Sequence, residues 1–164
     1  MTHSDVIVEI LERSLGMLTK ALADFSDTDM LVRPTPTANH AEWMIGHLCK
    51  SETFMLGACG GDTTDLLPPG FAECYPQVKG ELPEVANPLG KQALIDLFTK
   101  VRGRTIAFVK SAGEDALLKQ VPSPFNKGSM TTVMFMLMMP SLHGSLHLGQ
   151  IQVIRRVLGK PILF

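Results

Sequence analysis

The chain has 164 residues, within the usual range of roughly 100–200 for one domain, so we expect a single domain over residues 1–164. Its 15 lysines and arginines against 16 aspartates and glutamates leave a formal net charge of -1, which argues against nucleic acid as a partner. No window of about 18 apolar residues and no secretory-signal pattern is present, so we expect a cytoplasmic protein that binds no membrane.

Two helices are predicted in the first part of the chain. In residues 4–25 apolar side chains recur at the 3.6-residue period of one helical face. Residues 27–38 contain two prolines and are predicted to form an ordered connection. A second helix is predicted to begin at Asn39, because Asn39 followed by Glu42 has the form of a capping box, and to end within the glycines of residues 57–61.

The second part of the chain contains a long loop and two further predicted helices. Five prolines make the segment after the second helix an irregular loop of the kind that often shapes a site; they stand at positions 68, 69, 76, 83 and 88. The third helix is predicted over residues 89–112, with Gly113 as its stop. After a turn-rich stretch at 121–128, the fourth is predicted over residues 129–158, where Pro140 either kinks the helix or marks its start.

No alternating stretch rich in Val, Ile and Thr competes with these patterns, so we predict an all-α four-helix bundle with strand content near zero. The composition is 45% hydrophobic and only 19% charged, and residues 133–142 are apolar on nearly every face. We interpret that segment as a contact with a second subunit, which predicts a homodimer. Cys49, Cys59 and Cys74 are odd in number and lack CxxC spacing, so we expect reduced, structural thiols.

Three histidines form the candidate site. His143 and His147 are four residues apart on the fourth predicted helix, so their imidazoles project from one face, and the apolar residues of that face turn them toward the interior. His47 lies on the core-facing stripe of the second predicted helix and supplies a third nitrogen. Buried neutral imidazoles each need a partner, whereas one cation uses all their lone pairs. We therefore predict a divalent transition metal at His47, His143 and His147.

The weaker alternative is that these histidines are hydrogen-bonded core residues without a metal, since an HxxxH pair alone is weak evidence. Three protein ligands with an open position are typical of catalytic rather than structural zinc, and imidazoles suit zinc, nickel, copper or iron. Gln150, one turn beyond His147, is the candidate to hold the other ring nitrogen of His147.

Further residues are assigned from their positions on the predicted helices. The residues predicted to line a substrate pocket are Trp43, Ser51 and Met139, although plain core packing explains Trp43 equally well. His3 and His40 are predicted to face solvent or to cap a helix. Cys59 and Cys74 are placed in loops near the pocket mouth, without an activating neighbour.

The runs Trp43-Met44-Ile45-Gly46-His47-Leu48 and His143-Gly144-Ser145-Leu146-His147-Leu148-Gly149-Gln150 resemble the DinB/YfiT-like superfamily of metal-dependent enzymes. In that family a histidine in the middle of the second helix is combined with an HxxxH pair on the fourth. The resemblance implies an up-down-down-up bundle, frequently dimeric, with nickel or zinc bound by the three histidines. The family includes thiol-dependent S-transferases and an isomerase that use bacillithiol, mycothiol or glutathione.

The leading functional hypothesis is a metal-dependent S-transferase that joins a low-molecular-weight thiol to a small-molecule electrophile, with the metal favouring the thiolate. A metal-dependent hydrolase is the nearest alternative, because the same metal lowers the pKa of water. A non-catalytic bundle that binds the metal or a hydrophobic ligand is a second class, and a metal-free structural bundle is a third.

Overall fold

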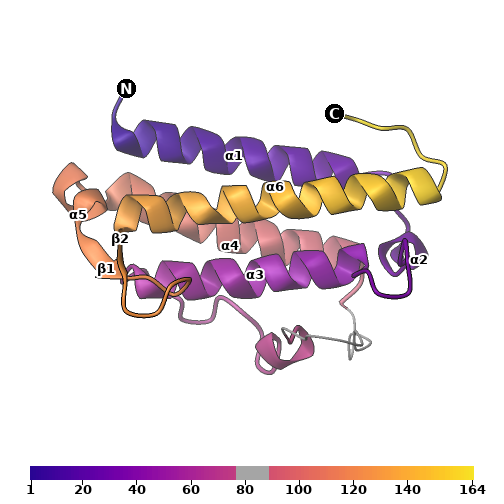
Figure 1. Ribbon diagram of the computed structural model, residues 1–164, viewed down its shortest axis with the longest axis horizontal. Helices are drawn as coiled ribbons and strands as arrows, with labels where there is room; N and C mark the ends of the chain where they lie inside the picture. The colour runs from indigo at the N-terminus through magenta and orange to yellow at the C-terminus, as the bar shows by residue number, and fades with distance from the viewer. Residues whose placement is uncertain (77–88) are drawn as a thin grey trace.

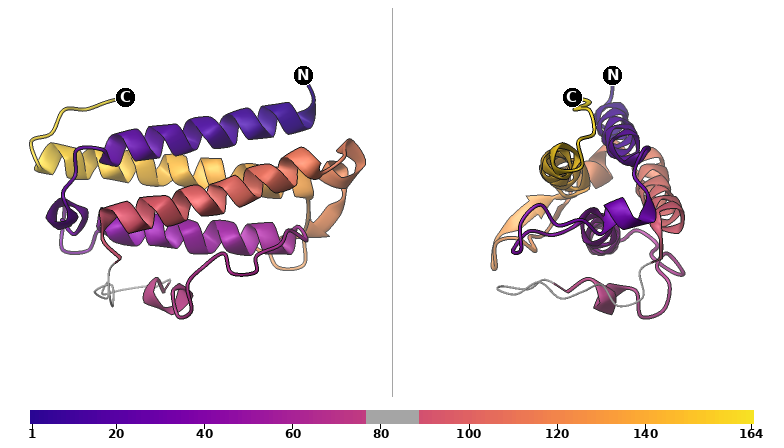
Figure 2. Two further views of the ribbon diagram at one scale, coloured as in Figure 1. Left: turned by 180° about the vertical axis from the view of Figure 1, so that it is seen from behind. Right: turned by 90° about the vertical axis from the view of Figure 1, so that its right-hand side faces the viewer.

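Four long helices lie side by side along one axis in the computed structural model, which describes residues 1–76 and 89–164 (Figures 1 and 2). The long helices are α1 (His3–Leu22), α3 (Ala41–Ala58), α4 (Lys91–Ser111) and α6 (Val133–Val157). The short elements are α2 (Asp27–Met30), the 3-10 helix η1 (Ala72–Cys74), α5 (Glu114–Leu118), β1 (Gln120–Pro122) and β2 (Met130–Thr132). The predicted four-helix bundle is confirmed.

The four helices form a ring in which α1 packs against α4 and α6, and α3 packs against the same two helices. In Figure 1, α1 and α6 run from left to right, whereas α3 and α4 run from right to left. Neighbouring helices α3 and α6 are therefore antiparallel, and a residue near the middle of α3 faces a residue near the middle of α6. No helix in the described part of the chain is both long and apolar enough to cross a bilayer.

The start of α3 differs from the prediction. His40, not Asn39, is the N-cap, and its Nδ1 accepts a hydrogen bond from the backbone N–H of Trp43 at 3.0 Å. Glu42 does not complete a capping box, because its side chain turns into the core and accepts a hydrogen bond from the Tyr75 hydroxyl. His40 was predicted either to face solvent or to cap a helix. It caps α3, and its side chain is buried rather than exposed to solvent.

The region before α6 contains a β-hairpin that the sequence did not predict. β1 and β2 are antiparallel, with Gln120 opposite Thr132 and Pro122 opposite Met130. The fourth helix consequently begins at Val133 rather than at residue 129, because the preceding residues bond to β1 and the Thr132 hydroxyl caps the helix. Pro140 lies inside α6, which continues on both sides of it, so Pro140 does not mark the start.

A buried ion pair joins three of the long helices. Arg102 of α4 donates from Nε to both carboxylate oxygens of Glu52 on α3, at 2.9 and 3.1 Å. Its Nη1 donates to the Leu11 carbonyl and the Ser14 hydroxyl of α1. Both charged side chains are buried. These contacts at Nε and Nη1 replace part of the water that a guanidinium loses on burial, while Nη2 has no partner among the described residues. They fix how α1, α3 and α4 are positioned relative to one another.

The described part of the predicted irregular loop, up to residue 76, packs on the outer side of α3; residues 77–88, with the prolines at 83 and 88, lie outside the described residues. The Tyr75 ring is buried directly over Gly46, where a Cβ atom would lie 2.0 Å from a ring carbon. The ammonium of Lys50 donates to the carbonyls of Ala72 and Tyr75. Glycine at position 46 is thus required by this close approach.

Replacing Gly46 by Ala is expected to lower the free energy of unfolding by about 1–3 kcal/mol, because the buried Tyr75 ring must move. Gly16, in the middle of α1, is the matched control, because no atom lies within 4 Å of the place that its Cβ would take. Gly16→Ala is expected to raise the same free energy by about 0.5–1 kcal/mol. Urea unfolding of both variants measures the contrast; equal effects would contradict the assigned role of Gly46.

Candidate metal centre

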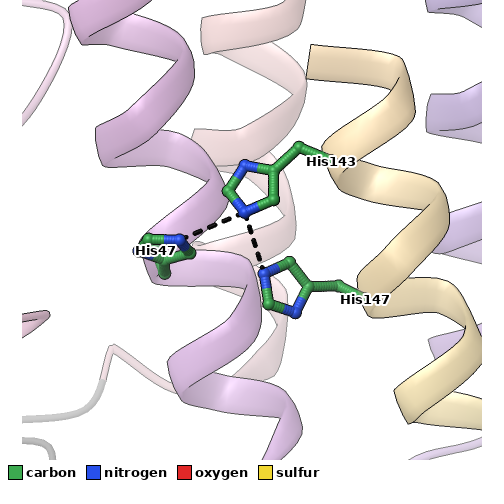
Figure 3. Close-up of side chains that lie close together, drawn as sticks. All are labelled: His47, His143 and His147. Carbon is green, nitrogen blue, oxygen red and sulfur yellow. Dashed lines mark hydrogen bonds between the residues drawn. The ribbon is translucent and has the colours of Figure 1, made fainter. Parts of the chain in front are cut away.

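The three predicted histidines meet between α3 and α6. His47 extends from α3, and His143 and His147 extend toward it from successive turns of α6 (Figure 3). The Nε2 atom of His143 lies 3.2 Å from Nε2 of His47 and 3.1 Å from Nε2 of His147. A ligand atom from each ring lies within 4.8 Å of the other two, so the cluster could hold one metal ion.

Two of the three rings are oriented by different neighbours. The His147 Nδ1–H donates to Gln150 Oε1 at 2.7 Å, which is the contact that the i, i+3 spacing suggested. His47 has no hydrogen-bond partner at Nδ1 within the described residues, but its ring stacks on Trp43 with centroids 4.6 Å apart and planes 11° apart. Trp43 therefore holds His47 by ring stacking where Gln150 holds His147 by a hydrogen bond.

Burial keeps the imidazoles in the form that binds metals. Burial lowers the pKa of His47 to about 4, and the neighbouring His143 and His147 contribute to that shift. The pKa of His143 also falls to about 4, from burial and from His147. Burial lowers the pKa of His147 too, partly opposed by the hydrogen bond to Gln150. All three rings are neutral near pH 7, with a lone pair available on each.

The hydrogen-bonding pattern fits a bound cation better than a metal-free core. Because His147 donates from Nδ1 to Gln150, its Nε2 carries a lone pair that points toward His143. A proton on His143 Nε2 can be donated to Nε2 of His147 or to Nε2 of His47, but not to both. Without a cation, the two short contacts cannot both be hydrogen bonds donated by His143. Tetrahedral ligands at about 2.0–2.1 Å from a metal are about 3.3 Å apart, close to the two short Nε2 separations. The donor set therefore fits a divalent transition metal.

A cavity of about 460 Å³ opens beside the cluster, and His47 and His143 form part of its wall. Ser51 and Met139, two of the three predicted pocket residues, also lie on this wall. Trp43 does not; it lies behind His47 as its stacking partner. Most of the apolar wall was not predicted from the sequence to line the pocket. Its residues are Phe54, Met55, Pro124, Phe125, Leu142 and Leu146.

Helical spacing contained a signal for part of that wall. Phe54 follows His47 at the i+7 position and Ser51 at the i+3 position, so it shares their face of α3. Phe125 comes from the connection between β1 and β2, and no pattern in the sequence indicated that this connection reaches the site.

The other histidines and the cysteines lie outside the cluster. His3 pairs with Glu114 on the surface, and His40 caps α3. All three cysteines are free, and neither Cys59 nor Cys74 lines the cavity beside the histidines. Burial raises the pKa of the Cys59 thiol to about 11 and that of Cys49 well above its usual value. These two thiols are poor nucleophiles near neutral pH.

A family model described as the DinB superfamily matches residues 10–151. This chain belongs to the DinB superfamily. The resemblance carried by the three histidines is thereby confirmed. The match includes all of α3 and α4 and most of α1 and α6. A comparison with curated proteins finds no match.

Two solved structures support the fold of this DinB superfamily member. A conserved protein from Enterococcus faecalis is similar with a TM-score of 0.73 and 18% sequence identity, over 98% of this chain and 99% of that one. YfiT from Bacillus subtilis is similar with a TM-score of 0.66 and 15% identity, over 96% of this chain and 89% of that one. YfiT is described as a probable metal-dependent hydrolase with an unusual four-helix bundle topology.

Replacing Gln150 by Leu is expected to weaken zinc binding by roughly 10- to 100-fold, because His147 loses the acceptor that orients it. Gln150→Glu keeps an acceptor oxygen at the same distance along the side chain and should bind zinc nearly as tightly as the wild type. Isothermal titration calorimetry on both variants measures the difference, and equal losses of affinity would argue against an orienting hydrogen bond.

Nickel binding is expected to quench the fluorescence of Trp43, the only tryptophan of the chain, because its ring stacks on a ligand of the cluster. Quenching should saturate at one equivalent of nickel. His143→Ala should abolish this saturating phase, whereas His3→Ala, which removes a surface histidine outside the cluster, should retain it. A quenching curve unchanged by His143→Ala would place the nickel elsewhere.

Proposed function

We propose that this protein is a metal-dependent enzyme, specifically a thiol-dependent S-transferase whose divalent metal, zinc or nickel, is held by His47, His143 and His147. One observation carries the proposal. The three ring nitrogens converge beside an open cavity, whose wall includes His47 and His143, so three protein ligands are combined with access for a small molecule. Structural zinc sites, in contrast, fill all four positions with protein groups.

The metal would supply Lewis acidity, which favours the deprotonated form of a thiol at neutral pH. The residues of the protein hold the metal-binding rings in place. Gln150 and Trp43 fix two of the rings, and the helices that carry them are rigid elements of the bundle. A substrate bound against the apolar wall would exclude water from the cavity, which would strengthen electrostatic interactions at the cluster.

The transfer step conserves atoms and charge. The thiol loses its proton to the buffer, and the sulfur forms a bond to the electrophilic carbon of the second substrate. The bond from that carbon to its leaving group breaks, and the leaving group departs as an anion. Cysteines of the chain are not needed in this step, because none of the three lines the cavity and burial raises the thiol pKa of Cys49 and Cys59.

A hydrolase is the second candidate, favoured by the description of YfiT, whose fold is similar. In that reaction water would be the nucleophile in place of the thiol. It would attack the carbonyl carbon of an ester or amide, and the bond from that carbon to the alcohol or amine would break. The same three histidines would be required, so loss of activity on their mutation does not separate the two reactions. The dependence on thiol separates them.

We further propose that the protein acts in the cytoplasm as a homodimer. Large apolar side chains of α6 that are exposed in the single chain and do not line the cavity support the dimer; they are Phe135, Val153 and Val157. Within residues 133–142, however, Met136, Leu137 and Pro140 are buried in the bundle itself. Part of the apolar character of that segment is thus explained without a partner.

The zinc- or nickel-loaded protein is expected to accelerate the reaction of chlorodinitrobenzene with glutathione, bacillithiol or mycothiol, measured as the thioether absorbance above the uncatalysed rate. Removing the metal with a chelator, or replacing His143 by Ala, should remove the acceleration, and His3→Ala should not. If no thiol accelerates consumption of the electrophile while p-nitrophenyl acetate is hydrolysed without thiol, the transferase proposal fails and the hydrolase replaces it.

A further inference from the structure

The cavity beside the histidines carries almost no charge. No carboxylate lines it among the described residues, and the one ammonium is that of Lys50. That ammonium donates to the carbonyls of Ala72 and Tyr75, neither of which belongs to the cavity wall. The aliphatic part of Lys50 therefore contributes to the wall while its charge is bound elsewhere, as is common for long basic side chains.

One hydroxyl is available inside the cavity. Ser51 lies one turn after His47 on the same face of α3 and is half-buried. Its hydroxyl makes no hydrogen bond to another side chain or to the backbone within the described residues. A ligand atom placed near the histidines could therefore accept or donate one hydrogen bond at Ser51, which would orient it.

Large apolar side chains surround the opening. Phe54, Phe125, Leu142 and Leu146 line the cavity and are 61%, 57%, 51% and 71% exposed, respectively. They come from three separate segments, namely α3, the β1–β2 connection and α6. Exposed apolar surface around a concave site is typical of a ligand-binding groove, because a bound apolar molecule removes that surface from water.

We infer that the electrophilic substrate is an uncharged molecule with an apolar, aromatic-sized body, which packs on Phe54, Phe125 and Leu146 and places its one polar group beside Ser51. This inference rests on the proposed function, since it names the substrate class of the same site. A charged body would lose its hydration against Phe54, Phe125 and Leu146, which offer no group to compensate a charge, and this disfavours binding.

Binding of two fluorescent probes to the zinc-loaded protein tests the inference without turnover. N-phenylnaphthylamine is uncharged, and anilinonaphthalene sulfonate has the same two ring systems plus a sulfonate. We expect the uncharged probe to bind at least 10-fold more tightly. Equal affinity, or tighter binding of the sulfonate, would overturn the inference.

Two phenylalanine variants locate the bound probe. Phe125→Ala removes part of the cavity rim and should weaken binding of N-phenylnaphthylamine several-fold. Phe135→Ala removes an exposed ring on α6 that does not line the cavity, and it should leave the affinity unchanged. Equal weakening in both variants, or none in Phe125→Ala, would show that the probe binds elsewhere and would contradict the inference.

The outcomes for substrate class and for catalysis can be told apart. If the uncharged probe binds at the cavity and the thiol assay is negative, the apolar ligand class stands and the transferase proposal fails. If the thiol assay is positive but the sulfonate probe binds as tightly as the uncharged one, the reaction stands and the ligand class is wrong.

Discussion

The arrangement of the bundle depends on the guanidinium of Arg102, which is buried among three helices and bound to Glu52, the Leu11 carbonyl and Ser14. Breaking such a buried pair costs about 3–5 kcal/mol, so α1, α3 and α4 cannot slide past one another without a large penalty. Glu52 and His47 are five residues apart, about 140° around α3. When Glu52 is bound to α4, His47 is consequently directed toward α6.

The position of α6 is fixed by a second buried arginine, near the C-terminal end of that helix. Arg155 donates to the Ala21 carbonyl, in the last turn of α1, and to both carboxylate oxygens of Asp24, which lies just beyond it. The two arginines thus tie α3 and α6 to a common partner, α1. This explains how His47 and His143, which are 96 residues apart in the sequence, bring their Nε2 atoms to within 3.2 Å.

The sequence allowed the helices and the histidine ligands to be predicted because both depend on local periodicity. An i, i+4 pair on an apolar stripe faces the core wherever the helix packs. The buried arginines, the turn of Glu42 toward Tyr75 and the β-hairpin depend on partners distant in the chain. Residues 130–132 lie next to a strongly helical run, and only their pairing with residues 120–122 makes them a strand. Local patterns do not contain that information.

The same division applies to function. The histidines determine which class of cation can bind, and their helical spacing makes them visible in the sequence. Which molecules the cavity can hold depends on its wall, which combines α3, α6 and the connection between β1 and β2. Because Phe125 reaches the site through a connection rather than a helix, its segment can change in length or composition without disturbing the bundle. A protein of this architecture can therefore keep the three-histidine cluster while the wall of its cavity changes.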